Sequence, residues 1–152
     1  LTGTQPASDG IYYIEVTGLT APDVKGNILS DSESPLGKIL KKNKKKKVAL
    51  KFGTISYGVT DMTKCFEGCT NLVQVSNIPD SITDMSSCFV GCTSLTSVTL
   101  KCGYLDGKVN YAFDGCSSLS VGSIKVPADS LDRYKDNADK MKAKAEWFAK
   151  DE

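Results

Sequence analysis

Apolar and polar residues recur at a fixed spacing through the middle of the chain. Three segments share one pattern: VTDMTKCFEGCTNL at 59–72, ITDMSSCFVGCTSL at 82–95 and VNYAFDGCSSL at 109–119. Their Phe, Gly, Cys and Leu residues repeat at steps of 23 and 24 residues. The recurring residues are Phe66, Phe89 and Phe113, Gly68, Gly91 and Gly115, Cys69, Cys92 and Cys116, and Leu72, Leu95 and Leu119. Four residue types in register over three units indicate an internal repeat.

Each unit predicts two parts, a strand and an opposite wall. A period of 23–24 residues falls within the roughly 20–29 residues of a leucine-rich repeat. Leu95, Val98 and Leu100 fit the L-x-x-L-x-L pattern of its strand, and two-residue alternation points Val98 and Leu100 inward. The predicted strands lie at 72–78, 95–102 and, less regularly, 119–126.

The opposite wall carries inward contacts of its own. Val59 and Met62 in the first unit, and Ile82 and Met85 in the second, precede a Cys-Phe pair on a short helical turn. The Gly after each Phe is expected to close that turn, where a positive φ or a close backbone approach suits a residue without Cβ. One unit cannot bury its own apolar edge, so adjacent units are expected to stack.

The F-x-G-C-[ST]-[NS]-L core and its V-T-D-M or I-T-D-M lead-in resemble the BspA-like leucine-rich repeats of bacterial surface proteins. The resemblance covers residues 54–127, about half of the chain. The third unit departs from the pattern, since Tyr111 and Ala112 stand where the second unit has Ser87 and Cys88. The resemblance implies a protein secreted or displayed at the bacterial surface, acting in adhesion to host matrix proteins or to other cells.

Both ends of a stacked array need covers, because exposed apolar ends aggregate. We predict an α/β fold: a short solenoid of about three coils, with a mixed N-terminal cap at 1–53 and a helical C-terminal cap at 128–152, forming one structural domain. In the N-terminal cap, 11–19 and 47–53 predict strands by their Ile, Tyr, Val and Phe content. Between them, Ser34 and Pro35 mark the start of a short helix.

The C-terminal segment shows an apolar stripe at helical spacing, which predicts a lid on the last coil, with partner docking as the alternative. The stripe consists of Leu131, Tyr134, Ala138, Met141, Ala145 and Phe148. Asn137 is a candidate break between two helices. Trp147 lies one step off the stripe, and lid packing is favoured for it over a binding hot spot.

Composition narrows the function. The 152 residues include no histidine, so Ser-His-Asp and Cys-His catalysis and His-ligated zinc are excluded. The 19 basic and 18 acidic residues leave a net charge of +1, which argues against a global nucleic-acid or membrane footprint. No apolar run approaches the roughly 18 residues of a membrane span. The first residues, LTGTQPASDG, show no targeting signal.

Six cysteines raise the question of disulfides or metal. Cys65 and Cys88 form one column, with Ala112 in third place, and a second column holds the recurring cysteines named above. Columns stack into a core, where free Cys behaves as a small apolar residue. Buried free thiols are therefore favoured over disulfides and over a four-thiolate metal site. Cys102 lies outside both columns and is expected to be the most accessible thiol.

The run KKNKKKK at 41–47 is a candidate anion site. Its lysines are Lys41, Lys42, Lys44, Lys45, Lys46 and Lys47. Such a block can bind heparin-like polymers or anionic lipid, while the favoured alternative is a solvated helix end whose lysines complement the helix C-terminus. No aromatic residue interleaves the run and Arg133 is the sole Arg, which argues against nucleic-acid recognition.

Asp61 and Asp84 recur once per unit, and paired carboxylates can hold calcium or transfer protons. Lys108 stands at the same place in the third unit and breaks the series. A turn or capping role is therefore favoured for both. We expect no catalytic residue, no metal and no cofactor.

Repeat solenoids present extended surfaces for protein recognition, so a non-enzymatic binding module is the favoured function. The outward residues of the predicted strands are the candidate contacts: Gln74, Ser76, Ser97, Thr99, Lys101, Ser123 and Lys125. Two alternatives stay open. One is binding of anionic polysaccharide through the Lys41–Lys47 run, and the other is a structural segment of a longer array that has no ligand of its own.

Overall fold

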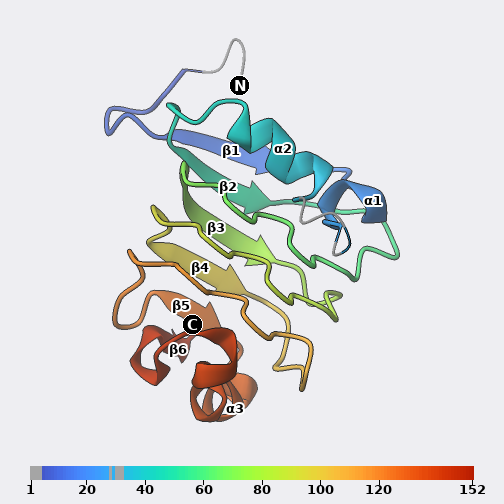
Figure 1. The fold of residues 1–152 in the computed structure, drawn as a ribbon, viewed down its shortest axis with the longest axis vertical. Coiled ribbons are helices and arrows are strands. Elements are labelled where there is room, and N and C mark those ends of the chain that lie inside the picture. The colour runs from blue at the N-terminus through green and yellow to red at the C-terminus, as the bar shows by residue number, and fades with distance from the viewer. Residues whose placement is uncertain (1–4, 28, 30–32) are drawn as a thin grey trace.

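The computed structural model describes residues 5–27, 29 and 33–152, and its centre is a six-stranded parallel sheet (Figure 1). The strands are β1 (Tyr12–Val16), β2 (Val48–Phe52), β3 (Leu72–Ile78), β4 (Ser97–Leu100), β5 (Ile124–Val126) and β6 (Phe148–Lys150). They lie side by side in sequence order, so each connection runs back along the other side of the molecule. This parallel sheet with few helices is an α/β repeat fold, as the sequence predicts.

The helical segments are short. They are α1 (Ala21–Val24), α2 (Pro35–Lys41) and α3 (Leu131–Asp136), with 3₁₀ turns η1 (Ala128–Ser130), η2 (Ala138–Met141) and η3 (Ala145–Trp147). Helix α2 begins as predicted: the Ser34 hydroxyl accepts a hydrogen bond from the Gly37 N–H at 3.1 Å, and Pro35 occupies the first helical position. Strand, helix and strand therefore precede the first repeat, while α1 was not predicted.

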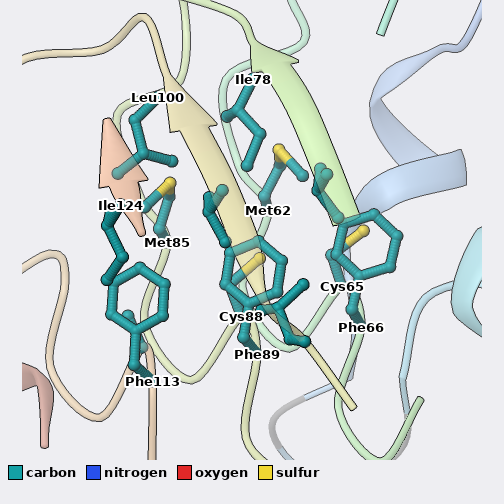
Figure 2. Close-up of a cluster of buried hydrophobic side chains, with 14 of the residues drawn as sticks. Met62, Cys65, Phe66, Ile78, Met85, Cys88, Phe89, Leu100, Phe113 and Ile124 are labelled. Carbon is teal, nitrogen blue, oxygen red and sulfur yellow. The ribbon is translucent and has the colours of Figure 1, made fainter. Parts of the chain in front are cut away.

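Backbone hydrogen bonds join the wall opposite the sheet from one unit to the next. The Phe66 N–H donates to the Cys88 carbonyl at 2.8 Å, and the Phe89 N–H donates to the Ala112 carbonyl at 2.8 Å. The wall is thus hydrogen-bonded in the same way from each unit to the next, although none of the strands described above lies in it. The predicted inward residues Val59, Met62, Ile82, Met85 and the Cys-Phe pairs are all buried. Figure 2 shows Met62, Met85 and the two Cys-Phe pairs in this cluster.

The three recurring phenylalanines stack through the core. Ring centroids lie 5.5 Å apart for both Phe66–Phe89 and Phe89–Phe113, with interplanar angles of 16° and 5°. At each end of the phenylalanine stack, a further ring from a strand outside the predicted repeat range packs edge-on. Phe52 of β2 lies 6.4 Å from Phe66, and Phe148 of β6 lies 6.2 Å from Phe113. The terminal segments therefore complete both the sheet and its core.

The glycine column behaves as predicted. Gly91 and Gly115 have φ values of 74° and 76°, and a Cβ added to Gly115 would lie 3.4 Å from the Gly91 Cα. Both the positive φ and the close approach of successive units therefore favour glycine here.

The C-terminal cap is only partly helical. Asn137 ends α3, which confirms the predicted break, but Phe148 lies in β6, so the prediction of helix to the end of the stripe is wrong. A strand is favoured over a helix here because β6 pairs with β5. It also places the Phe148 ring at the end of the phenylalanine stack, with its centroid 5.4 Å from that of Tyr134. Tyr134, Met141 and Trp147 are buried, which confirms the lid packing expected of them.

Candidate functional site

The structure has five of the seven predicted contact residues on adjacent strands of the sheet, while Lys101 follows β4 and Ser123 precedes β5. Gln74 pairs in register with Ser97, and Thr99 pairs with Lys125. Gln74, Ser76, Ser97, Thr99, Ser123 and Lys125 are half-buried, whereas Lys101 is exposed. Lys101 lies just beyond β4 and forms an ion pair with Asp151, so its charge is already compensated.

A β-bulge shapes this face between β3 and β4. Val75 pairs with Val98 and Ile78 with Leu100, so two residues of β3 stand opposite one of β4. Asn77 takes up the extra residue with a φ of 60°, in the left-handed region that Asn tolerates better than most residues. The bulge lets Ile78 point into the core while Ser76 stays on the outer side.

The first two strands extend this face, which the sequence analysis missed. Tyr13 pairs with Ala49, Ala49 with Gln74, and Lys51 with both Glu15 and Ser76. Together with Ile14 and Leu50, the side chains of these two rows line a shallow hollow of about 340 Å³. The sequence predicts both strands but treats them as part of a cap, so it does not show that their outward residues continue the same sheet. We call residues 13, 15, 49, 51, 74, 76, 97, 99 and 125 the sheet face.

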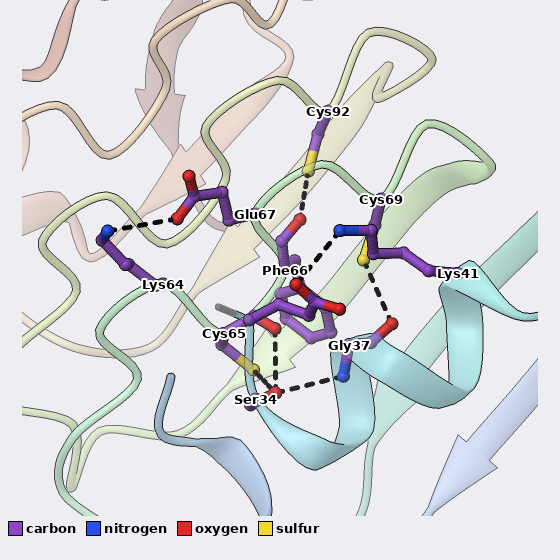
Figure 3. Close-up of polar contacts among 10 residues, drawn as sticks. Ser34, Gly37, Lys41, Lys64, Cys65, Phe66, Glu67, Cys69 and Cys92 are labelled. Carbon is purple, nitrogen blue, oxygen red and sulfur yellow. Dashed lines mark hydrogen bonds and ion pairs between the residues drawn. The ribbon is translucent and has the colours of Figure 1, made fainter. Parts of the chain in front are cut away.

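The cysteine columns are buried structural positions. All six thiols are free and buried, which confirms the favoured interpretation. The Cys92 thiol donates to the Phe66 carbonyl at 3.1 Å (Figure 3). The Cys116 thiol donates to the Phe89 carbonyl, also at 3.1 Å. In the first unit the Cys69 thiol points to the Gly37 carbonyl of α2 at 3.6 Å. Helix α2 therefore takes the place of a preceding unit.

The expectation for Cys102 is wrong. Its side chain is 2% exposed and lies 4.0 Å from the hydroxyl of Tyr134. Tyr134 comes from α3 and donates a hydrogen bond to the Cys102 carbonyl at 3.1 Å. The C-terminal cap covers this thiol, a long-range contact that the repeat pattern alone does not reveal.

These thiols are expected to be unreactive in the folded protein. Burial raises the pKa of Cys69 and of Cys116 to about 12, and raises those of Cys65, Cys88 and Cys92 strongly as well. The thiolate is the nucleophile, so a neutral buried thiol reacts slowly. Mass spectrometry after iodoacetamide treatment at pH 7.5 should find no label in the native protein and six labels in urea. Fast labelling of any native thiol would contradict this arrangement.

The recurring aspartates hold turns. The Asp61 carboxylate accepts the Thr63 N–H at 2.9 Å, and Asp84 accepts the Ser86 N–H at 3.0 Å. Partial burial disfavours ionisation of Asp61, but its hydrogen bond from Thr63 and its ion pair with Lys25 hold its pKa below the ordinary value. These bonds support the turn role. Within the described ranges, no group of three or more acidic or cysteine side chains is arranged to hold a metal ion.

The lysine run divides into engaged and exposed side chains. Lys41 pairs with Glu33 at 3.0 Å, Lys46 lies 5.3 Å above the ring of Tyr12, and the Lys47 ammonium donates to the Ser94 hydroxyl at 2.8 Å. Lys42, Lys44 and Lys45 are exposed, and so is Lys47 despite its hydrogen bond to Ser94. The run lies at the end of α2 and leads directly into β2 (Figure 1).

The comparison with known families agrees with this architecture. The sequence model of the BspA type leucine rich repeat region matches residues 45–138, in six copies. The chain belongs to the BspA-type leucine-rich-repeat family. The match extends beyond 54–127 on both sides, in agreement with the contribution of β2 to the sheet. Neither the curated proteins nor the solved structures compared with the chain gave a match.

Membership of the BspA-type family supports a repeat-based interaction or surface module. Such repeats generally serve as non-enzymatic binding scaffolds. Among the described helices, none has the length and apolar character that crossing a membrane requires.

Proposed function

We propose that this BspA-type chain is a non-enzymatic module that recognises extracellular proteins through the sheet face, as part of a short solenoid. It acts outside the cell or at the bacterial surface, where proteins of host matrix or of other cells are the partners. The family membership supports the general role, and the sheet face supplies the particular surface.

The observation that carries this proposal is the composition of the sheet face over β1–β4. Small side chains at Ala49 and Ser76 leave a shallow hollow, so a partner can approach closely. Beside them, Tyr13 is 57% exposed on the same side. Tyrosine is enriched among the residues that contribute most to protein interfaces, because it combines a large apolar ring with a polar end. Glu15 and Lys51 provide opposite charges at the rim.

The test compares arginine substitutions on two sides of the molecule. Partners captured from plasma and matrix extract are identified by mass spectrometry, purified and measured by biolayer interferometry. Ser76→Arg with Thr99→Arg fills the sheet face, and we expect affinity to fall at least about tenfold. Thr60→Arg with Ser117→Arg adds the same charge at exposed positions outside the sheet face, and we expect it to bind like the wild type.

Equal binding by both double variants would reject the sheet face as the contact surface. A complete lack of partners in every extract would favour the alternative, a structural segment of a longer repeat array.

A further inference from the structure

A buried side chain holds the loop that carries the lysines. Asn71 is fully buried, and its amide nitrogen lies within hydrogen-bond distance of three carbonyl oxygens: Leu40 at 3.1 Å, Asn43 at 3.1 Å and Lys46 at 3.0 Å. These carbonyls belong to the last turn of α2 and to the segment after it. We call residues 42–47 the lysine loop.

Backbone bonds fix the same segment a second time. The Asn43 N–H donates to the Leu40 carbonyl at 3.0 Å, and the Lys46 N–H donates to the Asn43 carbonyl at 2.8 Å. The backbone of the lysine loop is therefore held both by the buried Asn71 side chain and by its own backbone hydrogen bonds. A ligand that binds a pre-ordered loop loses less conformational entropy than one that must order it.

The repeat motif allows either Asn or Ser at the position of Asn71. The same position in the next two units holds Ser94 and Ser118, five residues after Phe89 and Phe113. The hydroxyl of Ser118 reaches a single carbonyl, that of Thr93. The longer amide is thus found where the chain must organise the lysine loop, and the smaller serine where it connects ordinary units.

The lysine loop presents positive charge around a hollow. Lys42, Lys44 and Lys45 are exposed, and a hollow of about 370 Å³ is lined by residues 41–46. Glu33 precedes the N-terminus of α2, and its carboxylate is paired with Lys41 from the last turn of the helix. The ammonium groups of Lys42, Lys44 and Lys45 are therefore concentrated on one short, ordered segment, where their repulsion disfavours the loop unless an anion neutralises it.

We propose that the lysine loop binds a sulfated polysaccharide. Lysine is a compact point charge that suits tetrahedral sulfates without requiring bidentate geometry. Nucleic acid would favour stacking platforms, but the ring of Tyr12 beside the loop is covered by Lys46. A membrane surface would favour a longer amphipathic helix, whereas α2 has seven residues with Ile39 exposed among its lysines. The site lies apart from the sheet face and is independent of the protein partner proposed for that face.

Heparin serves as the probe, in 150 mM NaCl at pH 7.4, with affinity measured by biolayer interferometry. The triple variant K42Q/K44Q/K45Q removes three exposed charges and keeps Lys47, which bonds Ser94. We expect at least about tenfold weaker binding, because each ion pair formed releases counterions from the polymer. The matched control K135Q/K144Q/K150Q removes three exposed lysines from the C-terminal region and should stay within about twofold of wild type. Asn71→Ser keeps every charge and should weaken binding by a few-fold, after circular dichroism has verified its fold.

Several results would overturn the proposal. If the triple variant and its control both lost heparin binding, the attraction would be a general effect of charge and not a site at the loop. If the wild type eluted from a heparin column below 150 mM salt, the protein would have no specific heparin site. Equal or tighter binding of oligo-dT or of vesicles with 30% phosphatidylserine, equally sensitive to the triple variant, would assign the loop to nucleic acid or membrane. Unchanged affinity of Asn71→Ser would reject the ordering role. The sheet-face variants should bind heparin normally, which separates this proposal from the proposed function.

Discussion

Raising the pH from 7 to 9.5 is expected to remove most of the stability of this protein. Each buried thiol keeps its proton to a higher pH in the folded state than in the unfolded chain, where the pKa is about 8.5. Above that pH the unfolded state therefore binds fewer protons, so stability is fully present below about pH 8.5 and falls as the pH rises. The fall continues to about 12, the folded pKa of Cys69 and Cys116.

The expected size is large because the six thiols act together. Each contributes about 1.4 kcal/mol per pH unit once the unfolded thiol ionises. For six buried cysteines this sums to at most about 8 kcal/mol between pH 7 and 9.5, comparable to the whole free energy of unfolding of a typical domain, about 5–15 kcal/mol. Urea denaturation at both pH values, followed by circular dichroism in the presence of reductant, measures the change.

A double variant isolates the thiols from the lysines and tyrosines that also titrate at high pH. Cys65→Ala with Cys88→Ala leaves the column with the residue that the third unit already has, Ala112. Two of six thiols are then absent, so the stability lost between pH 7 and 9.5 should fall by about one third. Equal free energies of unfolding at the two pH values in the wild type would contradict the prediction.

Most of the fold could be predicted from the repeat, because the repeated residues make local contacts that recur in every unit. The positions of Phe66, Phe89 and Phe113 fix one contact per unit, and stacking follows once the first unit is known. The positive φ of Gly68 and Gly91 could likewise be expected from the turn each residue closes. A motif repeated three times is evidence that a single occurrence cannot provide.

The ends were harder because their contacts are long-range and occur once. Phe148 reads as the last member of a helical stripe, yet in the structure it lies in β6 and closes the phenylalanine stack. Cys102 looked accessible because Tyr134, which covers it, lies 32 residues away. In the sequence, Asn71 is one variable position of the repeat. Its role in holding the lysine loop is visible only in the structure, where its side chain contacts the carbonyls of Leu40 and Lys46.

The candidate sheet face shows the same limit. Alternation along 72–78 and 95–102 indicated which side chains point outward, since two-residue periodicity is a local property. The neighbours across strands are set by register, and the bulge at Asn77 shifts that register by one residue. The contribution of Tyr13 and Lys51 required knowing that β1 and β2 continue the same sheet.

Truncating the central ring of the phenylalanine stack is expected to cause the largest loss from one substitution. Phe89 is fully buried between Phe66 and Phe113, with centroids 5.5 Å away on both sides. Phe89→Ala removes buried apolar surface, leaves a cavity and ends both ring contacts, so the free energy of unfolding should fall by about 3–5 kcal/mol. Urea denaturation at pH 7 measures it.

Two further variants separate stacking from simple bulk and from aromatic content. Phe89→Leu keeps most of the volume and should cost clearly less than Phe89→Ala, because the apolar filling survives while the ring contacts do not. Tyr57→Ala removes an aromatic ring that is fully exposed and should change stability by no more than about 0.5 kcal/mol. If Phe89→Ala lost as little as Tyr57→Ala, the stacked rings would not be what holds successive units together, and the backbone hydrogen bonds of the wall would have to carry that role.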